Sequence, residues 1–162
     1  MGVWYSDKIF YVVPARLLRL DSSFNLVEDS LILREPYLFV CRNISGTKLL
    51  MIKSQYTDVS LGRLCELNLQ SLQTLTLRDS SYNVSSAIYL PGQNACVYYS
   101  YGSPAFNRVA GYYVLDLTTL EASLLFQYAS EIGPFEVVNG FDISPDGTRL
   151  LYPVPLQLKM DS

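Results

Sequence analysis

A strand–turn–strand pattern that recurs along the chain is the feature that most constrains its fold. The clearest copy spans Phe141–Tyr152, where two apolar runs flank the tight turn Pro145-Asp146-Gly147-Thr148. Similar turns occur at Ser45-Gly46-Thr47 and Pro91-Gly92-Gln93. Each turn supplies residues that tolerate a positive φ or preset a bend, and an apolar run follows each of them. Recurrence of this kind predicts a series of similar β-units.

A second landmark recurs with almost the same period. Leu20, Leu67 and Leu115 each precede an Asp or Asn, and successive members are 47 and 48 residues apart. A short turn and a further apolar run follow each leucine, so one unit holds four strands, here called a to d. Four strands in about 40–50 residues is the size of a propeller blade, and no segment shows sustained helical spacing. The sequence therefore predicts an all-β fold, a β-propeller made of four-stranded antiparallel blades.

The repeat divides the chain into blade units within a single propeller segment, residues 1–162. Residues 1–35 are expected to supply strands b, c and d of one blade, residues 36–79 and 82–127 two full blades, and residues 138–156 strands a and b of another. Closed propellers contain about 4–8 blades, so we expect an incomplete propeller, a fragment of a larger protein. Open blade edges would also favour self-association.

One motif carries a family resemblance. The run Ile143–Leu150, with its Pro-Asp-Gly turn, resembles the core of the WD-repeat-like β-propeller family, as found in TolB-like and prolyl oligopeptidase-type propeller repeats. The upstream turns at Gly46 and Gly92 lack the Pro-Asp-Gly triplet, so the close resemblance is confined to the last unit. It implies the fold and no particular activity, because unrelated functions share this scaffold.

The composition excludes several kinds of site within this chain. It contains no histidine, which rules out a Ser-His-Asp triad, a Cys-His pair and a His-ligated metal site. Cys41, Cys65 and Cys96 lack zinc-ligand spacing, and they are either buried thiols or one disulfide with a leftover thiol. A net charge of -3 without a basic run indicates no nucleic-acid footprint. We expect no catalytic residue, cofactor or metal.

Two acidic residues near the last turn are candidates for a metal site. Asp142 and Asp146 flank Pro145, but Asp146-Gly147 is typical of a hairpin turn in which the glycine takes the positive φ. The hairpin is the favoured interpretation.

The compartment stays open. Met1–Asp7 has neither the basic start nor the apolar core of a signal peptide, and no apolar stretch is long enough to span a bilayer. The chain is therefore cytoplasmic, or periplasmic or extracellular if a leader is removed.

The loops on one rim supply the candidate site. In a propeller the b–c and d–a connections emerge on the same rim, where loops vary on a rigid scaffold. Aromatic and arginine side chains are common interface anchors, so the candidate partner-binding residues are Tyr82, Tyr101, Phe106, Arg108 and Phe135. The alternative is ordinary packing of these loops.

A group of tyrosines lies near these loops. These tyrosines either stack on a sugar or peptide or bury their rings between blades. The group consists of Tyr98, Tyr99, Tyr101, Tyr112 and Tyr113.

Two functions follow, with a third kept open. The first is a non-enzymatic propeller module that binds a protein or peptide. The second is the gating propeller of a prolyl oligopeptidase-like serine hydrolase whose catalytic domain lies outside this chain. The third is a sensor or surface protein with a membrane segment elsewhere. A Gly-x-Ser-x-Gly elbow downstream in the full reading frame would favour the hydrolase.

Overall fold

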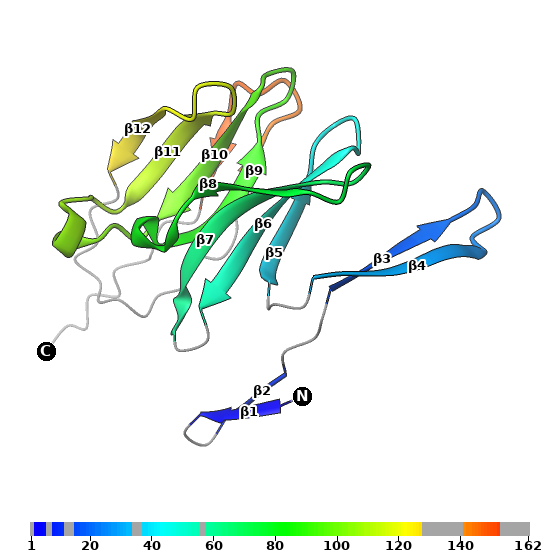
Figure 1. Cartoon of the computed structure of the whole chain (residues 1–162). Coiled ribbons are helices and arrows are strands. Elements are labelled where there is room, and N and C mark those ends of the chain that lie inside the picture. The colour runs from blue at the N-terminus through cyan, green and yellow to red at the C-terminus, as the bar shows by residue number, and fades with distance from the viewer. Residues whose placement is uncertain are drawn as a thin grey trace, which may run out of the picture.

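The computed structural model describes residues 2–5, 8–11, 15–33, 37–55, 58–127 and 141–152. Across these ranges the regular elements are strands, joined by two short 3₁₀ helices, η1 (Ser80–Tyr82) and η2 (Pro104–Phe106). The prediction of an all-β chain is confirmed for these residues (Figure 1). None of the helices in the described ranges is long and apolar enough to cross a membrane.

Two four-stranded antiparallel sheets form the centre of the structure (Figure 1). The first sheet consists of β5 (Tyr37–Arg42), β6 (Lys48–Gln55), β7 (Asp58–Asn68) and β8 (Thr74–Arg78). The second consists of β9 (Val84–Tyr89), β10 (Ala95–Ser100), β11 (Gly111–Asp116) and β12 (Ala122–Gln127). In both sheets the strands lie side by side in chain order, so each sheet is the meander that the repeat predicts. The division of the whole chain into blades stays a prediction.

The predicted hairpin turns lie at three glycines. Gly46, Gly92 and Gly147 have φ values of 68°, 70° and 72°. They close the hairpins β5–β6, β9–β10 and the short pair β13 (Asp142–Ile143) and β14 (Leu150–Leu151). An added Cβ would meet nothing within 4 Å at Gly46 or Gly92, so backbone conformation rather than space calls for glycine there.

The N-terminal strands differ from the prediction. They form two separate hairpins, which Figure 1 draws apart from the four-stranded sheets. The hairpins are β1 (Gly2–Tyr5) with β2 (Lys8–Tyr11), and β3 (Ala15–Leu20) with β4 (Leu26–Leu33). The expectation that this region begins at strand b is wrong, because β1 precedes β2 and pairs with it. Val3, Trp4 and Tyr5 are strong strand formers, and four residues before the turn are enough for a pair.

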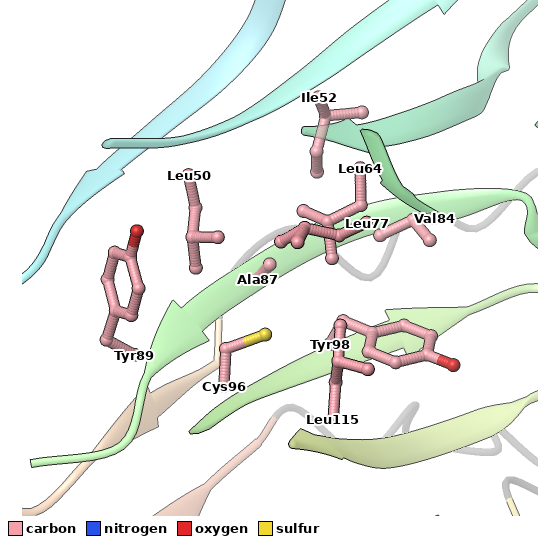
Figure 2. Packing of buried hydrophobic residues seen from close by; sticks show 10 residues of the cluster. All are labelled: Leu50, Ile52, Leu64, Leu77, Val84, Ala87, Tyr89, Cys96, Tyr98 and Leu115. Carbon is pink, nitrogen blue, oxygen red and sulfur yellow. The ribbon is translucent and has the colours of Figure 1, made fainter. Parts of the chain in front are cut away.

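The main hydrophobic core lies between the two four-stranded sheets. Leu50 and Ile52 of β6 lie toward Cys96 and Tyr98 of β10, with Leu64 among them (Figure 2). All five are at most 1% exposed. Alternate residues of one strand therefore face the neighbouring sheet, as the two-residue period of a strand requires.

The intervening residues build further clusters on the opposite faces. Met51 of β6 packs with Cys65 and Leu67 on the other face of the first sheet. On the far face of the second sheet, a cluster of Val97, Tyr99 and Tyr112 is covered by partly buried apolar residues of the last hairpin. Those residues are Phe141, Ile143 and Leu150. The inner strands β6 and β10 thus have buried residues on both faces, which explains why they read as nearly continuous apolar runs.

A buried polar bridge also joins the two sheets. Glu66 of β7 is 8% exposed. Its Oε1 accepts from Lys48 Nζ at 2.8 Å, and its Oε2 accepts from the Tyr89 hydroxyl of β9 at 3.0 Å. Burial, reinforced by the Glu66 charge, raises the pKa of Tyr89 and keeps this donor protonated.

The cysteines are thiols. Cys41, Cys65 and Cys96 all lie in described strands, and none is joined in a disulfide, so the disulfide alternative is wrong. Burial raises the pKa of Cys96 to about 12, which leaves the thiol unreactive near neutral pH.

Candidate functional site

The loop between β8 and β9 (residues 79–83) is the d–a connection from the first sheet to the second, and its own side chains hold its conformation. Asp79 caps η1, because its Oδ1 accepts from the backbone N–H of Ser81 at 2.9 Å. Asn83 ends η1 in the left-handed region with φ 47°. Its Nδ2 donates to the Gly102 carbonyl at 2.7 Å. This hydrogen bond joins the d–a loop to the b–c loop of the second sheet, which is residues 101–110 between β10 and β11.

The b–c loop that carries Phe106 and Arg108 closes on itself. Ser103 and Arg108 exchange backbone hydrogen bonds of 2.9 and 3.0 Å, which enclose η2. Gly102, at φ 72°, begins this closed loop. A Cβ at Gly102 would lie 2.6 Å from the Ala110 nitrogen, so only glycine fits.

Three of the predicted rim residues come together across these two loops. The guanidinium carbon of Arg108 lies 3.3 Å from the centroid of the Tyr82 ring and 5.9 Å from that of Phe106. Arg108 Nη1 also donates to Ser81 Oγ at 2.7 Å. Phe106 is 59% exposed. We call Tyr82, Phe106 and Arg108 the rim cluster.

The other two predicted rim residues do not join it. Tyr101 packs edge-to-face on Tyr99 at 5.2 Å and belongs to the cluster under the last hairpin. Phe135 lies outside the described residues.

The neighbouring tyrosines are mainly structural. Tyr98, Tyr99 and Tyr112 are at most 2% exposed, and Tyr98 stacks on Tyr113 with ring centroids 5.3 Å apart. Their rings are thus buried between sheets, the alternative to surface stacking on a ligand.

A pocket of about 290 Å³ lies beside the rim cluster. Its walls come from both four-stranded sheets and the loops between their strands. The lining residues are Arg78, Tyr82, Tyr98, Ser100, Arg108, Tyr113, Leu120 and Ala122. The pocket therefore adds Arg78, at the end of β8, to the residues that the sequence singled out. In the sequence, the one feature that marked Arg78 was its position as a charged residue at the end of Thr74–Arg78, where polar and apolar residues alternate.

Arg78 is a buried cation with neutral partners. It is 8% exposed, and its Nη1 and Nη2 donate to the carbonyls of Leu77 and Leu120, each at 2.8 Å. Its Nε has no hydrogen-bond partner within the described part of the chain. Its guanidinium carbon lies 5.0 Å from the centroid of the same Tyr82 ring that Arg108 covers.

The pKa values of the tyrosine hydroxyls at the pocket and of the nearby Asp79 carboxyl are shifted in opposite directions. Burial raises the pKa of Tyr98 and of Tyr113, although Arg78 and Arg108 respectively oppose the shift. Both phenols therefore stay protonated at neutral pH. The hydrogen bond from Ser81, with help from the charge of Arg108, holds the pKa of Asp79 below its usual 3.8.

The last hairpin uses its acidic residues for turn formation. Asp146 Oδ1 accepts from Ser144 Oγ at 2.5 Å and from the Thr148 N–H at 3.1 Å. Asp142 accepts from the Ile143 N–H at 2.8 Å. Across the described ranges no three acidic or cysteine side chains gather as potential metal ligands.

Solved structures share this arrangement of sheets. TolB from Acinetobacter baumannii superposes with a TM-score of 0.51 at 16% sequence identity, covering 78% of this chain and 28% of that chain. The fold is that of a β-propeller. An oligogalacturonate lyase in complex with manganese superposes with a TM-score of 0.58 at 15% identity, covering 85% of this chain and 40% of that one.

These structural similarities show the fold and assign no activity. The chain spans less than half the length of either propeller protein. No protein-family model and no curated protein matches the sequence. Any activity must therefore be argued from the residues of the propeller itself.

Proposed function

We propose that this propeller is a non-enzymatic binding module that captures a protein or peptide through the rim cluster. The observation that carries the proposal is the meeting of Tyr82, Phe106 and Arg108 across two loops that are far apart in sequence. Tyrosine and arginine are the residue types that dominate binding energy at protein interfaces. Phe106 stays 59% exposed beside them and supplies an apolar contact.

The rigidity of the two loops supports this function. The backbone bridge between Ser103 and Arg108 and the Asn83–Gly102 hydrogen bond hold the cluster before any partner arrives. Tyr82 and Ser81 hold the Arg108 side chain. A preorganised surface loses little conformational entropy on binding, so more of the contact energy contributes to affinity.

Screening a synthetic peptide library against the immobilised 162-residue chain tests the proposal. Isothermal titration calorimetry then measures the selected peptides against Phe106→Ala and Arg108→Ala. We expect each substitution to weaken binding by about tenfold or more, which corresponds to about 1.4 kcal/mol. Phe24→Ala and Arg149→Ala are matched controls, because both residues are exposed and lie outside the rim cluster. Unchanged affinity in both rim variants, or a library without a binder, would refute the proposal.

We also propose that the chain alone has no hydrolase activity. It contains no histidine, so no side chain of the usual type is present to activate a serine or cysteine nucleophile. The alternative role, a gating propeller for a hydrolase domain elsewhere, is compatible with the same rim cluster. It predicts that peptides bind this rim without being cleaved.

A further inference from the structure

We propose that the pocket beside the rim cluster binds a carboxylate of the peptide partner, with Arg78 and Arg108 as its two anchors. The inference rests on the proposed peptide-binding function and assigns the chemistry of the group that the pocket takes. The carboxylate is either the C-terminus of the peptide or an Asp or Glu side chain.

Two positive charges, those of Arg78 and Arg108, lie near the pocket. The guanidinium carbons of Arg78 and Arg108 both lie within 5.0 Å of the centroid of one Tyr82 ring. Among the described residues neither guanidinium forms an ion pair, and the ion pair that does form joins Lys48 and Glu66. The charge of Arg108 helps to lower the pKa of Asp79, but Asp79 Oδ1 accepts its hydrogen bond from Ser81 instead. Two neighbouring cations repel each other, and an anion placed between them would add two attractive interactions that outweigh this repulsion.

Arg78 is buried without a carboxylate partner among the described residues. Arginine is almost never fully buried unless it is paired, because removing its charge from water is costly. Arg78 is only 8% exposed, yet its hydrogen-bonded partners in the described residues are the neutral carbonyls of Leu77 and Leu120. Its Nε–H has no acceptor there. A ligand carboxylate in the pocket would supply both the missing charge and an acceptor.

The walls of the pocket favour an organic carboxylate over an inorganic anion. Guanidinium groups match the planar geometry of a carboxylate, which accepts two parallel hydrogen bonds. The rings of Tyr82 and Tyr113, which are only partly buried, offer aromatic surface for the rest of the ligand. A volume of about 290 Å³ is at the small end of ligand pockets, about 300–1,000 Å³, so it suits one end or one side chain of a peptide.

Nuclear magnetic resonance titration of the isotope-labelled full chain tests the inference with defined probes. The first pair is acetyl-Gly-Gly-Phe with a free C-terminal carboxylate and the same peptide as its amide. The third probe, acetyl-Gly-Glu-Gly-amide, offers only a side-chain carboxylate, and the fourth is inorganic phosphate. We expect at least one carboxylate peptide to bind about tenfold or more tightly than the amide, with shifts at Ser100 and Tyr113. Preference for the first or the third probe identifies which carboxylate is taken.

Variants connect the affinity to the two arginines. Arg108→Gln should abolish the advantage of the carboxylate peptide over the amide. Arg78→Gln should do the same, and Arg78→Lys should restore part of that advantage, since it keeps the charge without the forked donor. Arg149→Gln is the matched control on an exposed arginine outside the pocket. Because Arg78 joins β8 to Leu120, its variants are compared only after circular dichroism shows a native spectrum, and Arg108→Gln decides if they do not fold.

The outcomes separate this inference from the proposed function. Library peptides that bind through the rim cluster equally well as acids and as amides would overturn the carboxylate site and leave the binding module standing. Phosphate binding as tightly as the carboxylate peptides would also overturn it, since the pocket would then accept any anion. If no peptide binds at all, both proposals fail.

Discussion

Gly62 of β7 lies against the backbone of β9 in the second sheet, and its replacement tests how closely the two sheets pack. A Cβ added at Gly62 would lie closer than 3.0 Å to two groups, Ile52 Cγ2 and the carbonyl oxygen of Val84. The isoleucine methyl can move by rotation, but the carbonyl belongs to the backbone of β9. Gly62→Ala therefore forces the two sheets apart over a core in which Leu64 and Val84 are fully buried.

The magnitude follows from the kind of contact. Inserting a methyl group into a packed core costs about 1–3 kcal/mol. Since one of the two clashes is with backbone, we expect the upper end, a loss of about 3 kcal/mol in the free energy of unfolding. A typical domain is stable by about 5–15 kcal/mol, so this one methyl would remove a large fraction of the total.

Equilibrium urea unfolding followed by circular dichroism measures the effect. Gly92→Ala is the matched control: its Cβ would meet nothing within 4 Å, so only the positive φ of 70° penalises it, by about 1 kcal/mol. The transition midpoint should fall much further for Gly62→Ala than for Gly92→Ala, with similar slopes. An equal or smaller loss for Gly62→Ala would refute the close approach of β7 and β9.

Four further outcomes are expected. Tyr89→Phe leaves Glu66 without one of its buried donors and should lower the free energy of urea unfolding by about 1–3 kcal/mol; no change would mean that water replaces the hydroxyl. Leu72 has φ 56°, so Leu72→Asn should raise the free energy of urea unfolding by up to about 1 kcal/mol, and a fall would show that its contacts outweigh the backbone strain. Because the pKa of Asp79 is lowered, its carboxylate stabilises the folded chain above pH 3.8, and this contribution is lost as the pH falls through the lowered pKa. The stability difference between wild type and Asp79→Asn should therefore shrink in acid, and a constant difference across pH would contradict this. Purified chain should hydrolyse p-nitrophenyl acetate no faster than buffer does, and turnover abolished by one substitution would overturn the non-enzymatic assignment.

Local features of the sequence were enough to predict the sheets. A tight turn needs residues that accept particular dihedral angles, and Gly46, Gly92 and Gly147 mark those positions within a few residues of chain. Strands that follow each other through short turns pair with their neighbours, so the meander follows from the turn spacing alone. The pairing of β1 with β2 was not predicted in this way, because the repeat has no upstream copy with which to align β1.

The rim cluster was half predictable. Tyr82, Phe106 and Arg108 are aromatic and basic residues in loops that a propeller places on one rim, so their types and positions marked them as candidates. Tyr101 belongs to the same loops and has the same chemistry, yet it packs on Tyr99 instead. Which face a loop residue turns to depends on the contacts that the neighbouring strands leave open, and a linear pattern does not contain those contacts.

The pocket was decided by tertiary structure. Arg78 ends a strand of the first sheet, and the carbonyl that holds its Nη2 belongs to Leu120, which is 42 residues further along the chain. The burial of Arg78 and its approach to Tyr82 exist only because the two sheets pack face to face. Sequence periodicity determines which residues of a strand share a face, since that is set by the two-residue repeat of the backbone. Packing between segments distant in sequence determines which groups lie opposite that face. It therefore also determines whether a charged side chain contacts water, a carbonyl or a ligand.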